Sequence, residues 1–338
     1  MDPYVMRQYH FDDLGQMPFK RLTVRSAVGG SDPVQFLIVH NRAQELNRTH
    51  EERRAELSEL VSPDVGSRLL LLYYRFISPQ FPVLPLQPEA TVDELSPDVL
   101  AAVYVLALDF STFDDVLCIS TVYEEQQRQK LRAFVIACLR EQEGQPTLSS
   151  VQSALLLTLA PPDDYLMPNN EGASSLASML VSLSNAMGLQ HDPSDWNVSA
   201  ADKAMRRRLS CLVLMSDSWV AAVTGRPPLI SLDNWLVSQV SAEDVASGGA
   251  DPDAMSGFVQ LVDLSRTLRH ILQRLFSLTA SRRLSTNLPE TLSIAQPLME
   301  QVAEWHLNIL VAQKPAHHDS QHITLGQPGG PLARHRNT

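Results

Sequence analysis

The stretch from Ser199 to Asp233 constrains the fold most, because it predicts one long buried helix with a defined start and end. Ser199 and Asp202 have the spacing of a capping box at a helix N-terminus. Gly225 and the following Pro227-Pro228 then end the helix, since glycine adopts left-handed geometry cheaply and proline cannot continue a helix. Between these limits, spacings of three and four predict one packed stripe of Met205, Leu209, Leu212, Ser216, Trp219 and Val223. Because residues 211–215 are apolar on every face, we expect this helix, over 200–224, to lie at the centre of a bundle.

Other helices are predicted in the same way, from apolar residues at helical spacing between capping and breaking residues. We expect them at 50–61, 64–78, 97–109, 121–142, 148–159, 173–187, 253–281 and 290–311. The apolar run 36–39 fits either a strand or an extended docking segment. The predicted fold class is therefore all-α, as one bundle-like domain over 51–311. An irregular segment is expected at 1–50, and a disordered tail rich in His, Gly and Pro at 312–338.

Composition narrows the classes of function. The net charge is −11 over 338 residues, whereas proteins that bind nucleic acid through phosphates usually carry the opposite sign. The three cysteines, Cys118, Cys138 and Cys211, lie far apart in apolar segments, which predicts buried thiols and not a disulfide framework or a zinc site. No apolar run is long enough to span a membrane, and the N-terminus lacks a signal-peptide pattern, so we expect an intracellular, soluble protein.

Charged residues in the long helix allow more than one interpretation. Asp217 lies in an apolar stretch, where a carboxylate needs a partner, and Arg226 is the partner that we expect if the chain folds back. A ligand-sensing acid or a general base is the alternative for Asp217. The triplet at 206–208 suggests nucleic-acid binding or nuclear import. Consecutive helical residues point about 100° apart, however, so we favour a solvated helix start with local ion pairs.

Carboxylate and histidine clusters elsewhere are weaker candidates. Asp109 with Asp114-Asp115, and the pair at 163–164, suggest a magnesium-dependent enzyme acting on a diphosphate, although loops and helix caps explain both groups. The histidines at 317, 318 and 322 could bind a divalent metal weakly. The chain contains no phosphate-binding glycine loop, nucleophile elbow or metalloprotease motif.

Several ordered motifs together resemble the fungal-specific transcription factor domain, the middle homology region of fungal zinc-cluster regulators. They are Arg206-Arg-Arg-Leu209, Met215-Ser-Asp217-Ser-Trp219, and Gly225-Arg-Pro-Pro-Leu-Ile230 with Asp233. The lead-in at 186–196, the segment 73–84 and the helix at 148–157 are similar to the same family. The residues that carry this resemblance are Arg207, Asp217, Trp219, Gly225, Arg226 and Pro227.

The resemblance implies an all-α regulatory domain that controls RNA polymerase II transcription in the nucleus and is not an enzyme. It implies transcriptional co-regulators or a DNA-binding partner, a homo- or heterodimer, and a small-molecule effector as the classes of partner. Members of the family carry six closely spaced cysteines that hold zinc and read DNA, but no cysteine precedes Cys118 here. We therefore expect no cofactor in this chain, and DNA binding only if such a module is present or a partner supplies it. The alternative function is an all-α magnesium-dependent enzyme acting on a diphosphate or another small substrate.

Overall fold

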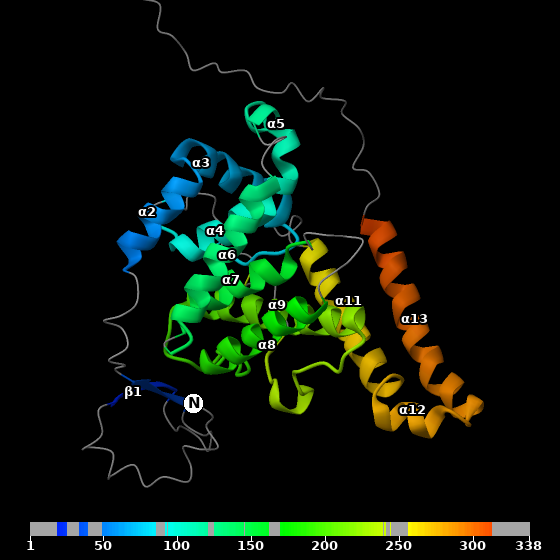
Figure 1. The fold of residues 1–338 in the computed structure, drawn as a ribbon. Coiled ribbons are helices and arrows are strands. Elements are labelled where there is room, and N and C mark those ends of the chain that lie inside the picture. Colours follow the sequence, from blue (N-terminus) through cyan, green and yellow to red (C-terminus); the bar gives the residue numbers. More distant parts are fainter. Residues whose placement is uncertain are drawn as a thin grey trace, which may run out of the picture.

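The computed structural model describes residues 19–25, 34–39, 49–85, 92, 94–120, 125–144, 146–161, 170–238, 240, 244 and 256–312. Within these ranges the chain is mostly helical, as Figure 1 shows. This confirms the predicted all-α fold class.

The first half of the helical body surrounds one fully buried helix, α4 (Pro97–Ala107). Every residue of α4 is buried, because its sequence is apolar on all faces apart from Asp98, whose carboxylate accepts a hydrogen bond from Ser153 at 2.9 Å. The helices that pack around it are α2 (His50–Leu60), α3 (Pro63–Leu72), α6 (Glu125–Glu141) and α7 (Leu148–Leu159). A π-helical turn (Tyr73–Ile77) extends α3, and a 3-10 turn (Leu108–Phe113) and α5 (Leu117–Ser120) follow α4.

The second half adds helices in sequence onto α7. They are α8 (Asn170–Ala186), α9 (Ala200–Thr224), α11 (Ser256–Arg274), α12 (Leu278–Leu284) and α13 (Leu288–Ala312). Packing runs from α7 to α8, from α8 to α9, from α9 to α11 and from α11 to α13. In Figure 1, α13 therefore lies at the outer edge of the body, next to α11 and α12, whereas α9 lies inside it. The predicted central position of α9 is confirmed by the complete burial of Leu209, Leu212 and Val213.

Close approach between α3 and α4 depends on Gly66. A Cβ atom at this position would lie 2.4 Å from the hydroxyl oxygen of Tyr104, which is itself buried. The glycine thus lets the two helices meet at a distance that no other residue would allow without movement of the tyrosine.

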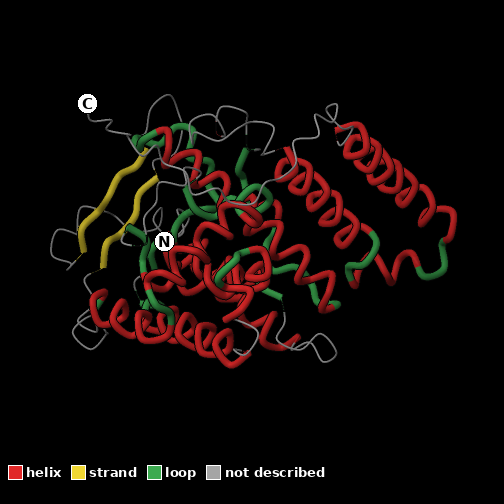
Figure 2. The backbone as a smooth tube through the Cα atoms, turned by 90° about the horizontal axis from the view of Figure 1, so that it is seen from above, coloured by secondary structure: helices red, strands yellow, loops and turns green. Residues whose placement is uncertain are grey.

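Two strands precede the helices and form an antiparallel pair, visible side by side in Figure 2. They are β1 (Phe19–Arg25) and β2 (Val34–Val39), with Phe19 opposite Val39 and Leu22 opposite Phe36. Of the two readings of the run 36–39, the strand is confirmed. Its partner β1 was not anticipated from the sequence.

The predicted helices are present, with differences in their limits. The second helix starts at Pro63, after Ser62, one residue before the predicted start. The predicted helix 253–281 is two helices, because Ser277 accepts a hydrogen bond from the Ala280 amide and so starts α12 after α11 has ended. The helix expected over 121–142 is described from Glu125 to Glu141, and 121–124 lie outside the described residues. The tail beyond Ala312 also lies outside them.

Two of the three predicted buried thiols, Cys138 and Cys211, are buried, while Cys118 is half-buried. None of the described helices combines the length and the apolar character that crossing a membrane would need.

Candidate functional site: the junction around helix α9

The residues that carry the family resemblance lie on and around α9. The segment before this helix and the segment after it both pack beside it. The turn before α9 and the segment after it meet where the Leu236 amide donates to the Gln190 carbonyl oxygen at 2.9 Å. His191 and Leu236 form a parallel bridge at the same place. We call the assembly of residues 188–196, helix α9 and residues 225–238 the α9 junction.

Helix α9 begins as predicted, with Ser199 as its N-cap. The Ser199 hydroxyl oxygen accepts from the Asp202 amide at 3.1 Å and donates to the Asp202 carboxylate at 2.6 Å. At the other end Gly225 adopts left-handed geometry, with φ 67°, and its amide donates to the Ala221 carbonyl oxygen. Both limits follow from the residue types that the sequence places there.

The three consecutive arginines point to three different environments, as their helical spacing requires. Arg206 donates to the Met187 carbonyl oxygen at 2.9 Å and lies over the Trp196 ring, 5.1 Å from its centroid. Arg207 binds carboxylates, and Arg208 is buried with an exposure of 2%. The predicted local ion pairs are therefore present, at Arg207, but the helix start is less solvated than predicted, because Arg206 and Arg207 are half-buried and Arg208 is buried.

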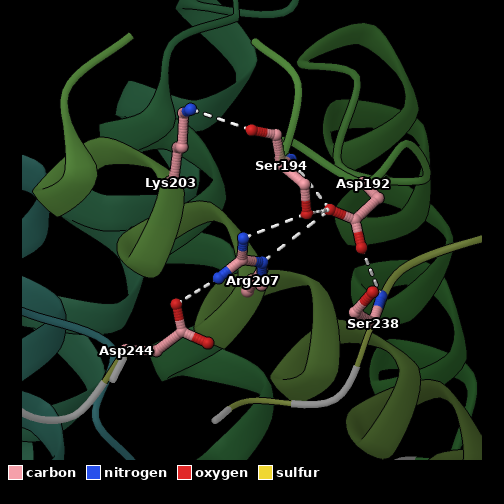
Figure 3. A network of polar contacts seen from close by, with 6 residues as sticks. All are labelled: Asp192, Ser194, Lys203, Arg207, Ser238 and Asp244. Atoms are coloured by element: carbon pink, nitrogen blue, oxygen red, sulfur yellow. Dashed lines mark hydrogen bonds and ion pairs between the residues drawn. The ribbon is translucent and has the colours of Figure 1, made fainter.

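Arg207 is the centre of the polar network in Figure 3. Its guanidinium pairs with the buried carboxylate of Asp244, donates to the Ser194 hydroxyl oxygen at 3.1 Å and lies 3.8 Å from Asp192. Asp192 in turn accepts from the amides of Ser194 at 2.8 Å and Ser238 at 2.7 Å. The network thus joins the segment before α9, the helix itself and the segment after it.

The environment of Asp192 favours its charged form. Burial acts to raise the pKa of this carboxyl, but the hydrogen bonds from Ser194 and Ser238 outweigh it and lower the pKa to about 2. Asp192 therefore carries a negative charge next to Arg207 over the whole range near neutral pH.

Asp217 forms a buried ion pair, but with a different partner from the one predicted. Its carboxylate accepts from Arg269 of α11 at 2.7 Å and from the amides of Leu229 at 2.9 Å and Ile230 at 3.0 Å. Arg269 also donates to the Ile230 carbonyl oxygen. All of the polar groups of this node are paired with one another, which favours an architectural role for Asp217 over ligand sensing or base catalysis.

The predicted Asp217–Arg226 pair is wrong. Arg226 follows the helix end and points to the surface, where it pairs with Glu171 of α8, and both side chains are largely exposed. Arg269 was missed because it lies 52 positions after Asp217 in a helix whose sequence shows only an amphipathic pattern. The spacing of the arginines within the motif gives no indication that Arg269 is the partner of Asp217.

Trp219 marks the edge of the buried stripe on α9. Its ring nitrogen donates to the Ser265 hydroxyl oxygen of α11 at 2.8 Å, yet the residue is 39% exposed. Val223, one turn later, is 74% exposed, so the predicted packed stripe does not extend to the helix end. A second tryptophan, Trp235, was not singled out by sequence, although it is buried and donates to Ser210 at 2.9 Å. Pro227 is exposed and stops the helix as expected.

Two of the carboxylates considered for magnesium, those of Asp109 and Asp114, are engaged in other contacts. Asp114 accepts from the amides of Val116 and Leu117, both at 2.9 Å, and pairs with Arg68, while Asp109 pairs with Arg128. The part of the chain that the structure describes contains no group of three or more His, Cys, Asp or Glu residues placed to hold a metal ion. Residues 163–164 and the histidines at 317, 318 and 322 lie outside it.

A family model described as "Fungal specific transcription factor domain" matches residues 70–307, which include the whole α9 junction. The chain belongs to this family. The resemblance carried by the signature residues is thereby confirmed.

Curated relatives of this chain are regulatory proteins by name, and two of them are named as regulators of transcription. The chain is 25% identical, over 84% of its own length, to an uncharacterized transcriptional regulatory protein of Schizosaccharomyces pombe. It is also 22% identical over 90% of its length to the transcriptional activator protein DAL81 of Saccharomyces cerevisiae. An acetamidase regulatory protein of Aspergillus fumigatus is 23% identical over 79% of it.

The chain spans less than half the length of these relatives, at 44%, 35% and 33% respectively. No solved structure matches it significantly.

Proposed function

We propose that this chain is the regulatory domain of an RNA polymerase II transcription regulator that works in the nucleus through protein partners and has no enzymatic activity. The family match over residues 70–307 carries this proposal, since the family and its named relatives are regulators of transcription. The engagement of Asp109 and Asp114 in arginine pairs and backbone hydrogen bonds also supports it over a magnesium-dependent enzyme. No resident cofactor is part of the proposal, and DNA reading is assigned to a zinc-cluster module or to a partner.

The outer face of α13 has the character expected of a partner contact. Four large apolar side chains on it are exposed to between 58% and 70%, namely Leu288, Leu292, Met299 and Leu307. The opposite side of α13 packs on α11, where Leu298 is buried and the Trp305 ring nitrogen donates to the Gln260 carbonyl oxygen at 2.7 Å. Exposed apolar side chains gathered on one helix face mark an interaction site.

Charge defines the partner that suits this face. Between Leu288 and Ala312 the helix contains the acidic residues Glu290, Glu300 and Glu304, and it contains neither lysine nor arginine. The complementary surface is a co-regulator protein that presents an apolar helix face flanked by basic residues.

Recruitment tests the proposal directly. The chain is fused to a heterologous DNA-binding module in yeast, and reporter output is measured in several nutrient conditions. We expect activation or repression relative to the module alone. An unchanged reporter in every condition, with the fusion present at normal levels, would contradict a regulatory role.

A pair of surface variants tests the assignment of α13. Leu292→Glu is expected to reduce the reporter response without lowering the melting temperature, because Leu292 is 58% exposed. Leu71→Glu on α3 is the matched control, since Leu71 is 64% exposed on a different helix. Equal loss of response in both variants would show that α13 has no special role.

A further inference from the structure

The buried guanidinium of Arg208 has fewer hydrogen bonds than it has donors. The residue is 2% exposed, and its Nε atom is buried without a hydrogen-bond partner. Within the described structure its guanidinium donates one hydrogen bond, from Nη2 to the Met205 sulfur at 3.6 Å. An interior guanidinium normally has a carboxylate partner, because burying an uncompensated charge is costly. Burial accordingly lowers the pKa of Arg208 to about 10.

The nearest acid is already occupied. Asp244 lies close enough to influence Arg208 electrostatically, but its carboxylate pairs with Arg207. Arg207 also lies 3.8 Å from Asp192, so both of these acids are engaged with Arg207, and within the described structure neither is hydrogen-bonded to Arg208. A carboxylate placed beside Arg208 would supply the acceptor that its guanidinium lacks.

A second hydrogen-bond donor converges on the same point from another helix. The Gln152 side-chain nitrogen of α7 lies 4.0 Å from the Met205 sulfur and also donates to the Val83 carbonyl oxygen at 2.9 Å. A thioether is a weak acceptor. Two donors from α7 and α9 therefore share an acceptor that serves neither well, whereas a carboxylate has two strong acceptor oxygens.

The surroundings are apolar. Tyr73 of the π-helical turn is fully buried next to Arg208, with its hydroxyl donating to the Phe81 carbonyl oxygen, and Val83 and Leu84 are fully buried beyond it. Apolar side chains of this kind suit the hydrocarbon part of a small molecule. A phosphate dianion would bring a second negative charge into this interior, so a single carboxylate fits better.

We propose that Arg208 and Gln152 bind the carboxylate of a small monocarboxylate effector between α7 and α9, beside Met205 and Tyr73. This inference rests on the proposed regulatory function, for which the effector would be the signal. Arg208 lies next to Arg207 on α9, so binding of the effector would directly affect the contacts of the α9 junction.

Binding is tested on the purified full chain by thermal unfolding and calorimetry. The probes are acetate, butyrate and benzoate at constant ionic strength, with the matching amides and inorganic phosphate as comparisons. We expect a saturable rise in melting temperature with at least one carboxylate and none with its amide. A rise with phosphate alone would assign the site to another anion and overturn the proposal, and so would the absence of a rise with any carboxylate.

Two matched variants locate the site. Met205→Glu places a carboxylate three residues before Arg208 on the same helix, where it can pair with the guanidinium. We expect it to raise the melting temperature of the ligand-free protein and to abolish the response to the carboxylate. Met205→Gln adds polarity without charge and should retain the response. Equal behaviour of the two variants would contradict the proposal.

Arg208→Met supplies an independent check. Removal of a buried guanidinium whose Nε lacks a hydrogen-bond partner should leave the chain folded, with a melting temperature at or above that of the wild type, and should weaken carboxylate binding at least tenfold. Strong destabilisation would show that Arg208 is a satisfied structural residue and would overturn the proposal. These measurements need no reporter, so loss of binding and loss of regulatory activity in the fusion assay remain distinguishable.

Discussion

Asp217 of α9 and Arg269 of α11 form an ion pair of 2.7 Å in which the two side chains are only 2% and 3% exposed. The same carboxylate holds the amides of Leu229 and Ile230, so the pair fixes the segment after α9 as well as the packing of two helices. Its stabilising effect depends on both members, because one alone would be a buried charge without compensation.

Arg269→Met is therefore expected to destabilise the chain by about 3–5 kcal/mol, the range for breaking a buried pair by removing one partner. Denaturant unfolding followed by circular dichroism measures the change. Arg226→Met is the matched control, since Arg226 and Glu171 are largely exposed, and surface pairs contribute about 0–1 kcal/mol. A large effect at Arg226 with none at Arg269 would restore the partner that the sequence suggested.

The Asp217–Arg269 pair also shows how much of the site can be predicted from the sequence. The need for a partner at Asp217 can be predicted from its apolar surroundings alone. The helix limits can be predicted from the capping residues Ser199 and Gly225. The identity of the partner does not, because Arg269 reaches Asp217 only through the packing of α11 on α9. The burial of Arg208 was missed for a similar reason, since it depends on packing against residues far away in the sequence, such as Tyr73.

Gly66→Ala is expected to destabilise the chain by about 1–3 kcal/mol, as overpacking of a tight core contact does. The added Cβ would lie 2.4 Å from the Tyr104 hydroxyl oxygen, and this tyrosine is buried within α4. Gly257→Ala provides the control, because nothing lies within 4 Å of the corresponding Cβ in α11. That substitution should stabilise the chain slightly through helix propensity, by less than the roughly 1 kcal/mol of a helix interior, because Gly257 is the second residue of α11. Opposite signs in thermal unfolding would separate the two effects.

Gly225→Ala isolates the cost of backbone geometry. Open space surrounds Gly225, so the only penalty comes from its φ of 67°. A residue with a Cβ in this conformation costs about 1–2 kcal/mol. We expect the free energy of unfolding to fall by this amount, and Gly225→Asn, which tolerates left-handed geometry, to fall by less. Identical losses for both variants would point to a contact at this position instead.

The carboxylate of Asp192 makes the stability of the α9 junction depend on pH. Its folded pKa of about 2 lies below the ordinary aspartate value of about 3.9, so the folded state binds the proton less readily than the unfolded chain does. The stabilisation is therefore fully present above about pH 4 to 5 and is lost as the pH falls from about 4 toward 2.

We expect Asp192→Asn to lower the free energy of unfolding at pH 6 by about 1 kcal/mol, a value reduced for solvent screening because the side chain is partly exposed. The difference between wild type and variant should stay constant from pH 7 to 5 and shrink below pH 4, where the carboxylate is protonated in the unfolded chain before it is protonated in the folded protein. Urea unfolding across this range measures it. A difference that persists unchanged at pH 3 would show that the introduced side-chain amide disrupts the hydrogen bonds to Ser194 and Ser238 for steric reasons, and that the charge of Asp192 is not what stabilises the junction.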